Sequence, residues 1–324
     1  MTDGRRSSTP AGGFAVLAAL ALVVAACATG AGDLGTVAPP HGTSGPSLDI
    51  PSAEPTPGSS APAGSPAATF DSSTTIRTYF MLGSHTGDAG LVAVLRSIRS
   101  TYAVGAAAMT QLLAGPVGSE LSSNPALYTG IPAGTRFLGL EIQPSDSVHG
   151  TAFVNLSSEF DAGGTSATLA QRYAQVVFTL TQFPTITDVL FEIDGEQTPA
   201  VITGGTVDRF TPVNRDTYAD LLPPIWVDRP GWGGALPSGS QVSGNADVFE
   251  AQFRLMVLDA GGRALVDMPV NATCGTGCRG DFTVKVAYQV TSAQWGTLRV
   301  FEPSAKDGSP THVVDYPVWL TPAG

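Results

Sequence analysis

The sequence has few basic residues, few histidines and few cysteines. Lysine and arginine together number 16, against 27 aspartates and glutamates, so the net charge is −11. Nucleic acid and anionic lipid headgroups repel an acidic chain. The sequence also shows no basic groove, zinc finger or recognition helix. These absences argue against a nucleic-acid-binding protein.

The scarcity of histidine and cysteine bears on metal sites. The four histidines lie at positions 41, 85, 149 and 312, and none has metal-ligand spacing to another histidine or to a cysteine. We therefore predict no metal and no cofactor. Cys274 and Cys278 form one close pair with glycines between them. Half of a metal site would need a second pair, so the spacing favours a disulfide.

A long apolar run occurs only near the start of the chain. Residues 12–26 carry no charge and follow two arginines, Arg5 and Arg6. A run of about 15 residues is shorter than the ~20 that cross a bilayer. A basic stretch followed by a short apolar run is typical of a secretory signal. We predict that residues 1–26 are a signal peptide, and their removal leaves a net charge of −12.

The run ends in Val24-Ala25-Ala26-Cys27, which resembles the lipobox of bacterial lipoproteins. The resemblance implies that Cys27 receives a lipid and becomes the first residue of the mature protein. The protein would then lie outside the cytoplasm, anchored to the cell membrane. An ordinary signal peptide with a chance cysteine and an uncleaved anchor helix are the alternatives.

Residues 27–72 are rich in proline, serine, glycine, alanine and threonine. A segment with so few large apolar residues cannot bury enough surface to offset the cost of ordering the chain. We predict a disordered stalk behind the lipidated cysteine. Its root-mean-square reach would be roughly 35–40 Å.

Residues 73–212 mix strands with two helices. Leu169, Tyr173, Val176, Val177 and Leu180 follow helical spacing and predict one core-facing stripe, with Thr165 or Ser166 as the cap. The predicted order is ββαββαβ, an α+β domain in which a small sheet carries helices on one face. We expect half-buried alternation in the first strand and one apolar face formed by Leu138, Leu140 and Ile142 in the third.

After a linker at 213–222, residues 223–322 read as an all-β immunoglobulin-like sandwich. Phe249, Ala251, Phe253, Leu255 and Val257 alternate with polar residues, as in a half-buried strand. Seven short strands separated by turn residues predict the sandwich. They are expected at 225–227, 240–246, 249–259, 264–272, 281–288, 296–302 and 312–320.

Several ordered motifs resemble known domains. LLAGPVGSE, GIPAGTRFLGLEI, AFVNLSSEF, AQVVFTLTQFP and VLFEIDGE resemble the GerMN domain of sporulation and germination proteins. VSGNADVFEAQF, CRGDFTVKVAY and GTLRVFEPSAKDGS resemble the immunoglobulin-like domain that accompanies it in germination-type lipoproteins. The resemblance covers nearly the whole chain. It implies a domain pair more specifically than it implies a function.

Candidate sites for chemistry are sparse. Glu192, Asp194 and Glu196 share a strand and its turn, which suits a calcium or acid/base site, but a solvated strand end is the simpler interpretation. Asn155, Ser157, Ser158, Glu159 and Asp161 form a second polar patch, without the glycines of a nucleophile elbow. Trp232, in a loop rich in glycine and proline, is the tryptophan we expect to be exposed and to bind a partner.

The favoured hypothesis is a non-catalytic envelope lipoprotein that binds a protein partner or wall polymer. One alternative is a hydrolase acting on peptidoglycan or another glycan, with Glu159 and Asp161, or Glu192 and Asp194, as its carboxylate pair. Another alternative is an accessory regulator of a membrane sensor. No catalytic constellation is visible in the sequence, which favours binding.

Overall fold

We describe the protein from a computed structural model covering residues 72–83, 90–123, 125–144 and 149–322. The predicted signal peptide, Cys27, the stalk, and the histidines at positions 41 and 85 lie outside the described residues. The segment Ala67–Gly324 forms one compact unit. Among the described residues, no helix has both the length and the apolar character needed to cross a bilayer.

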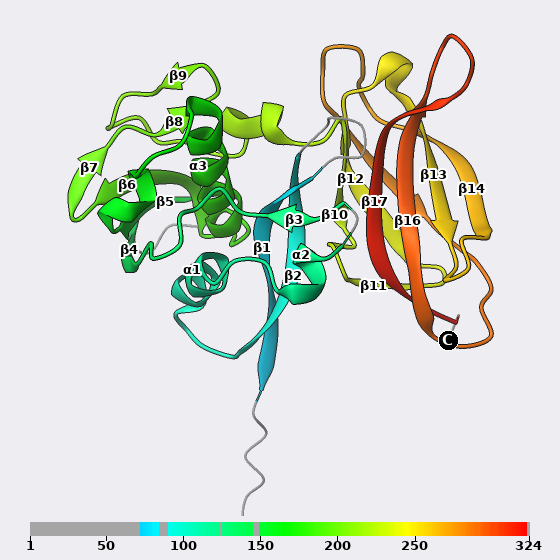
Figure 1. Ribbon diagram of the computed structural model, residues 1–324, viewed down its shortest axis with the longest axis horizontal. Helices are drawn as coiled ribbons and strands as arrows, with labels where there is room; N and C mark the ends of the chain where they lie inside the picture. Colours follow the sequence, from blue (N-terminus) through cyan, green and yellow to red (C-terminus); the bar gives the residue numbers. More distant parts are fainter. Residues whose placement is uncertain (1–71, 84–89, 124, 145–148, 323–324) are drawn as a thin grey trace, which may run out of the picture. The chain divides into compact units, whose positions relative to one another are not determined.

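The strands of the first domain form two main sheets and a small β8-β9 hairpin, so the single small sheet predicted from the sequence is wrong (Figure 1). One sheet has the order β2-β1-β3 and the other has the order β4-β5-β6-β7. The two sheets differ in how their strands pair. In the first, β1 and β2 form a long antiparallel hairpin over ten residue pairs. In the second, β5 and β6 are parallel, so the chain between them must cross over, and it does so through a helix. The strands are β1 (Ser73–Leu82), β2 (Gly90–Arg99), β3 (Leu127–Tyr128), β4 (Phe137–Gln143), β5 (Gly150–Leu156), β6 (Ile186–Ile193) and β7 (Glu196–Thr198).

Helices pack against both sheets. They are α1 (Val104–Leu113), the short α2 (Gly118–Leu121) and α3 (Ser166–Leu180), with a 3-10 turn η1 (Ser158–Asp161) before α3. A small hairpin follows, formed by β8 (Val201–Ile202) and β9 (Gly205–Thr206). The crossover helix α3 contacts β1 of one sheet and β6 of the other. It therefore holds the two sheets in one domain.

Helix α3 begins and packs as its sequence predicts. The hydroxyl oxygen of Thr165 accepts a hydrogen bond from the backbone N–H of Thr168 at 3.2 Å. Tyr173, Val176, Val177 and Leu180 are buried and Leu169 is half-buried, which confirms the apolar stripe. The helix is nevertheless buried on more than one side, because its polar residues Arg172, Gln175 and Thr179 are buried as well.

These polar side chains bind the backbone around the helix. The Gln175 amide donates to the carbonyl of Tyr79 in β1 at 3.0 Å and accepts from the N–H of Gly130 at 3.0 Å. Arg172 donates to the carbonyls of Gly130 and Phe160, both at 2.7 Å. The Thr179 hydroxyl accepts from the N–H of Tyr79 at 3.2 Å. The buried donors and acceptors are thereby satisfied.

Two strand predictions fail for identifiable reasons. Strand β1 is not half-buried, because Tyr79 packs on Phe178 of α3 while Phe80, on the other face, is also buried. In β4 the register shifts between Phe137 and Gly139. Leu138 consequently leaves the face shared by Leu140 and Ile142 and is 44% exposed. Period-two alternation cannot reveal either a second covering layer or a bulge.

The second domain is a two-sheet sandwich containing the seven predicted strands and one short addition, β11 (Figure 1). One sheet has the order β10-β12-β15, and the other has the order β11-β17-β16-β13-β14. Phe253 and Phe282 meet between the sheets with ring centroids 4.8 Å apart. The strands are β10 (Ile225–Arg229), β11 (Ala235–Pro237), β12 (Gln241–Ala246), β13 (Gln252–Leu258), β14 (Ala264–Asn271), β15 (Gly280–Lys285), β16 (Gln294–Pro303) and β17 (Pro310–Thr321).

The alternation predicted for β13 holds only from Phe253 onward. Phe253, Leu255 and Val257 are buried, but Phe249 is 56% exposed. Phe249 lies in a 3-10 turn, η3 (Phe249–Ala251), in which Glu250 and Ala251 adopt positive φ angles of 54° and 58°. This turn breaks the strand period, so Phe249 points away from the core.

The segment predicted as a linker is part of the fold. Val213 bridges to Val189 of β6, and the 3-10 helix η2 (Asp216–Leu221) buries Tyr218. After it, Trp226 of β10 packs edge-on against Phe178 of α3, with centroids 6.1 Å apart. One hydrophobic cluster of buried residues extends through both domains.

We predict that Gln175→Leu destabilises the protein by about 1–3 kcal/mol. Leucine fills a similar volume but leaves the Gly130 N–H and the Tyr79 carbonyl buried without this partner. Urea unfolding followed by circular dichroism measures the effect. Ser166→Ala, on the exposed first turn of the same helix, is the control and should change stability by less than about 0.5 kcal/mol. Equal stability of the two variants would contradict this role of Gln175.

Candidate functional site

Trp232 is buried, so the expectation that its side chain is exposed for partner binding is wrong. Only 6% of the residue is accessible. Its backbone N–H donates to the carbonyl of Ala93 in β2 at 2.7 Å, and its ring packs edge-on against Tyr316 at 6.3 Å. A Cβ atom on the neighbouring Gly231 would lie 3.1 Å from the same Ala93 oxygen. This loop, rich in glycine and proline, is thus in close contact with the first domain.

A cleft of about 390 Å³ opens beside this contact. Trp232 and the two β2 residues Val94 and Leu95 line it with apolar surface. Trp295 of β16 and Pro317 of β17 extend that surface within the sandwich. The polar wall comes from α2 and the residues around it. The remaining lining residues are Ser119, Glu120, Ser123 and Gly233.

The carboxylate of Glu120 is held in place by three hydrogen bonds. It accepts two from the guanidinium of Arg96, both at 2.6 Å, and one from the N–H of Val117 at 2.9 Å. The bidentate pair is largely buried, which gives it a fixed geometry. The negative charge in the polar wall is therefore compensated by a positive one behind it.

Trp295 also belongs to an exposed aromatic pair. It lies directly opposite Trp319 on the neighbouring strand, with ring centroids 5.2 Å apart and planes at 70°. The two residues are 54% and 36% exposed. Edge-to-face packing supports each ring while leaving indole surface in contact with solvent. The spacing of the two tryptophans in the sequence does not predict this pair, because only the strand register makes them neighbours.

The carboxylates considered for catalysis serve the fold or face solvent. Asp161 accepts a 2.8 Å hydrogen bond from the Tyr173 hydroxyl, whose pKa is raised by burial and by this carboxylate. Glu159 is exposed, and a hydrogen bond from the Ser157 hydroxyl lowers its pKa. The cleft beside Trp295 is lined by other residues.

The patch at the end of β6 is built around a turn. Glu192 pairs with Gln197 of β7, and Asp194 occupies the turn with a φ of 48°. The side-chain oxygen of Asn155 accepts from the N–H of Gly195 at 3.0 Å. Elsewhere, His312 contacts Glu302 at 2.9 Å. Within the described ranges, no three His, Cys, Asp or Glu residues are grouped as metal ligands would be.

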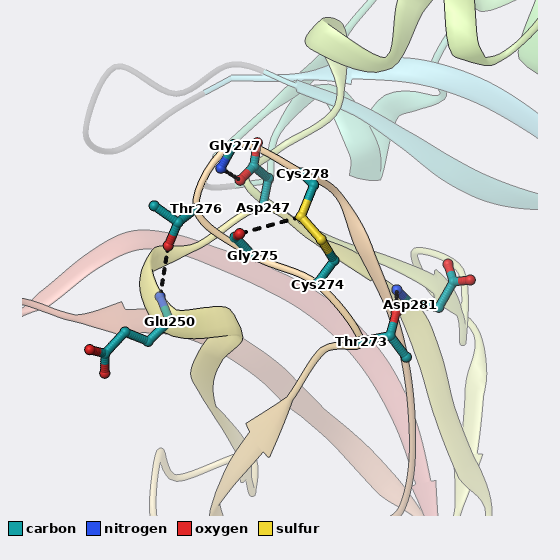
Figure 2. Close-up of a disulfide and its surroundings, with 9 residues drawn as sticks. All are labelled: Asp247, Glu250, Thr273, Cys274, Gly275, Thr276, Gly277, Cys278 and Asp281. Carbon is teal, nitrogen blue, oxygen red and sulfur yellow. Dashed lines mark hydrogen bonds between the residues drawn. A yellow bond between two sulfur atoms is a disulfide. The ribbon is translucent and has the colours of Figure 1, made fainter.

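Cys274 and Cys278 form a disulfide in the structure, with Cα atoms 5.8 Å apart (Figure 2). The distance lies in the range that a disulfide can span. Figure 2 shows that the closed loop is also tied to neighbouring segments. Gly277 donates to the Asp247 carboxylate at 3.0 Å, and Glu250 donates to the Thr276 hydroxyl at 3.0 Å.

Two domain families match the chain. Residues 77–199 match Germane, described as sporulation and spore germination, and residues 224–309 match Gmad2, the immunoglobulin-like domain of bacterial spore germination. The chain carries a GerMN-type domain followed by a germination-type immunoglobulin-like domain. A comparison with curated proteins finds no match.

Several solved structures are similar to parts of this chain. The first GerMN domain of the sporulation protein GerM from Bacillus subtilis is 23% identical, covers 45% of this chain and 98% of its own, and has a TM-score of 0.33. The tandem GerMN domains of the same protein are 16% identical to this chain. The match covers 66% of this chain and 61% of the other, with a TM-score of 0.35. CopC from Methylosinus trichosporium OB3b is 15% identical to this chain. The match covers 31% of this chain and 96% of CopC, with a TM-score of 0.21. These TM-scores mark a distant likeness, and no function follows from it.

We predict that Trp232→Ala destabilises the protein by about 3–5 kcal/mol, the usual effect of truncating a buried tryptophan. The cavity would open at the contact between the GerMN domain and the sandwich. Thermal and urea unfolding measure the loss. Phe249→Ala removes an aromatic ring that is 56% exposed in the same sandwich, and it should have little effect.

We predict that replacing both Cys274 and Cys278 with serine lowers stability only modestly. The loop between them is short, so the effect should fall below the ~3 kcal/mol expected for a 15-residue loop. The hydrogen bonds to Asp247 and Glu250 remain available to hold the loop. Unfolding of the double variant, compared with the oxidised protein, measures the difference. A loss above about 4 kcal/mol would contradict the prediction.

Proposed function

We propose that this protein is a non-catalytic lipoprotein of the cell envelope. A lipid on Cys27 would hold it at the outer face of the cytoplasmic membrane, where its domains would bind a protein partner or a wall polymer. The two germination-type domains and the lipobox at residues 24–27 support this proposal. Residues 24–27 resemble an export and anchoring motif, and they precede a pair of domains described from spore germination.

The surroundings of Glu159 and Asp161 favour a binding function over hydrolysis. A glycosidase needs one carboxyl group that stays protonated to act as the acid. The lowered pKa of Glu159 favours its ionised form, and Asp161 is committed to Tyr173. A lowered pKa is the opposite of what a general acid at Glu159 would need. The arrangement therefore supports a protein that acts through its surfaces.

We predict that Cys27→Ser releases the protein from the membrane or leaves an unprocessed precursor. The thiol of Cys27 is the atom to which the lipid would be attached, and serine lacks it. Cell fractionation and mass spectrometry of the mature N-terminus measure the change. The double serine variant of Cys274 and Cys278 is the control, because it keeps Cys27 and should remain anchored. An unmodified thiol at Cys27 in the native protein would overturn lipid anchoring.

The binding role has its own test on the same material. Crosslinking the anchored protein in intact cells should join it to an envelope protein or to wall material. The purified Cys27→Ser chain should release no product from peptidoglycan or from simple ester and glycan substrates. Turnover that disappears in Glu159→Gln or Glu192→Gln would instead establish the hydrolase alternative.

A further inference from the structure

The cleft beside Trp295 has the size and lining of a ligand site. Its volume of about 390 Å³ lies within the ~300–1,000 Å³ typical of small-molecule sites. Trp232 and Pro317 contribute apolar surface to it, and Ser119 and Ser123 contribute hydroxyl groups. A ligand that fits must therefore combine apolar surface with hydrogen-bonding groups.

Charge limits what that ligand can be. Among the described residues that line the cleft, Glu120 is the one charged side chain, and Arg96 compensates it from behind. No lining residue in the described chain supplies a free positive charge for a phosphate or carboxylate. The whole protein carries a net charge of −11 and repels polyanions. The charge pattern favours a neutral ligand.

The tryptophan pair indicates that the ligand is longer than the cleft. Trp295 lines the cleft and also touches Trp319, its partly exposed neighbour on the adjacent strand, which is not part of the cleft lining. The pair thus continues the apolar side of the cleft onto the open surface. Large aromatic residues left exposed next to one another mark a binding surface. Indoles suit a partner that is apolar on one side and wet on the other.

We propose that the cleft and the Trp295–Trp319 pair bind a neutral polysaccharide chain. Sugar rings have faces of C–H groups that pack on indole and rims of hydroxyls that hydrogen-bond to serine and carboxylate groups. One ring would lie in the cleft against Trp295, and the next would lie on Trp319. This proposal rests on the proposed function and specifies its wall polymer as an uncharged glycan.

The test uses the full-length Cys27→Ser chain and three probes. They are N-acetylglucosamine tetramer, cellotetraose and polyphosphate of similar length, measured by calorimetry and by tryptophan fluorescence. A neutral oligosaccharide should bind and shift the emission to shorter wavelength, and polyphosphate should not bind. Trp295→Ala should raise Kd at least about tenfold, and Trp319→Ala should raise it less. Phe249→Ala is the matched control, because its ring is equally exposed but lies outside the site.

Failure to fold is checked separately from failure to bind. Circular dichroism and the unfolding midpoint show whether Trp295→Ala keeps its structure. If it does not, Trp295→Phe should retain the fold and weaken binding. Saturation-transfer NMR on the wild-type complex should then place the sugar C–H protons against indole.

Three results would overturn the glycan proposal. They are absence of oligosaccharide binding at millimolar concentration, unchanged affinity in a folded Trp295 variant, and binding of polyphosphate in preference to the neutral probes. Crosslinking of the anchored protein to a protein partner through Trp295 would also overturn it. In each case, envelope crosslinks to a partner elsewhere on the surface would leave the proposed function standing. Absence of all envelope crosslinks would overturn the proposed function, while oligosaccharide binding by the purified chain tests the cleft by itself.

Discussion

The polar anchoring of α3 is the constraint on which the rest of the GerMN domain depends. Arg172, Gln175 and Thr179 lie inside the protein and bind the backbone of β1 and of the Gly130 and Phe160 segments. Such groups stabilise a fold only when each finds its partner, since an unmatched buried amide or guanidinium is costly. They consequently fix the position of the helix along its axis, which apolar packing alone leaves loosely defined.

From this helix the packing continues into the sandwich. Phe178 contacts Tyr79 on one side and Trp226 on the other. Arg215 lies over the ring of Phe178 at 4.9 Å and donates to the hydroxyl of Tyr79 at 3.1 Å. The packing is therefore continuous from α3 into β10 of the sandwich. The cleft lies beside a second contact between the two domains, where Trp232 meets β2.

The sequence predicted the elements better than it predicted their surroundings. The stripe of α3, its Thr165 cap and the sandwich strands follow from local periodicity and capping, which neighbouring residues determine. The exposure predicted for Trp232 is wrong because the burial of this residue depends on a contact with Ala93, far away in the chain. The glycines and prolines around Trp232 indicate only a loop. The burial predicted for Phe249 is wrong because the positive φ angles of Glu250 and Ala251 interrupt the strand, although the alternation of apolar and polar residues continues through them. The Trp295–Trp319 pair needed the register of β16 and β17, which no spacing rule supplies.

The order of strands in the larger sheet of the sandwich determines when its parts can form during synthesis. Strand β17 lies between β11 and β16, so β11 has its sheet partner only after residues Pro310–Thr321 have been made. Pro317, on the same strand, also accepts a hydrogen bond from the N–H of Gly233, beside Trp232. Contacts this distant in sequence form late and slowly. During folding, the sandwich would thus pass through a stage with an unpaired β11 and no cleft, and β17 would complete both together.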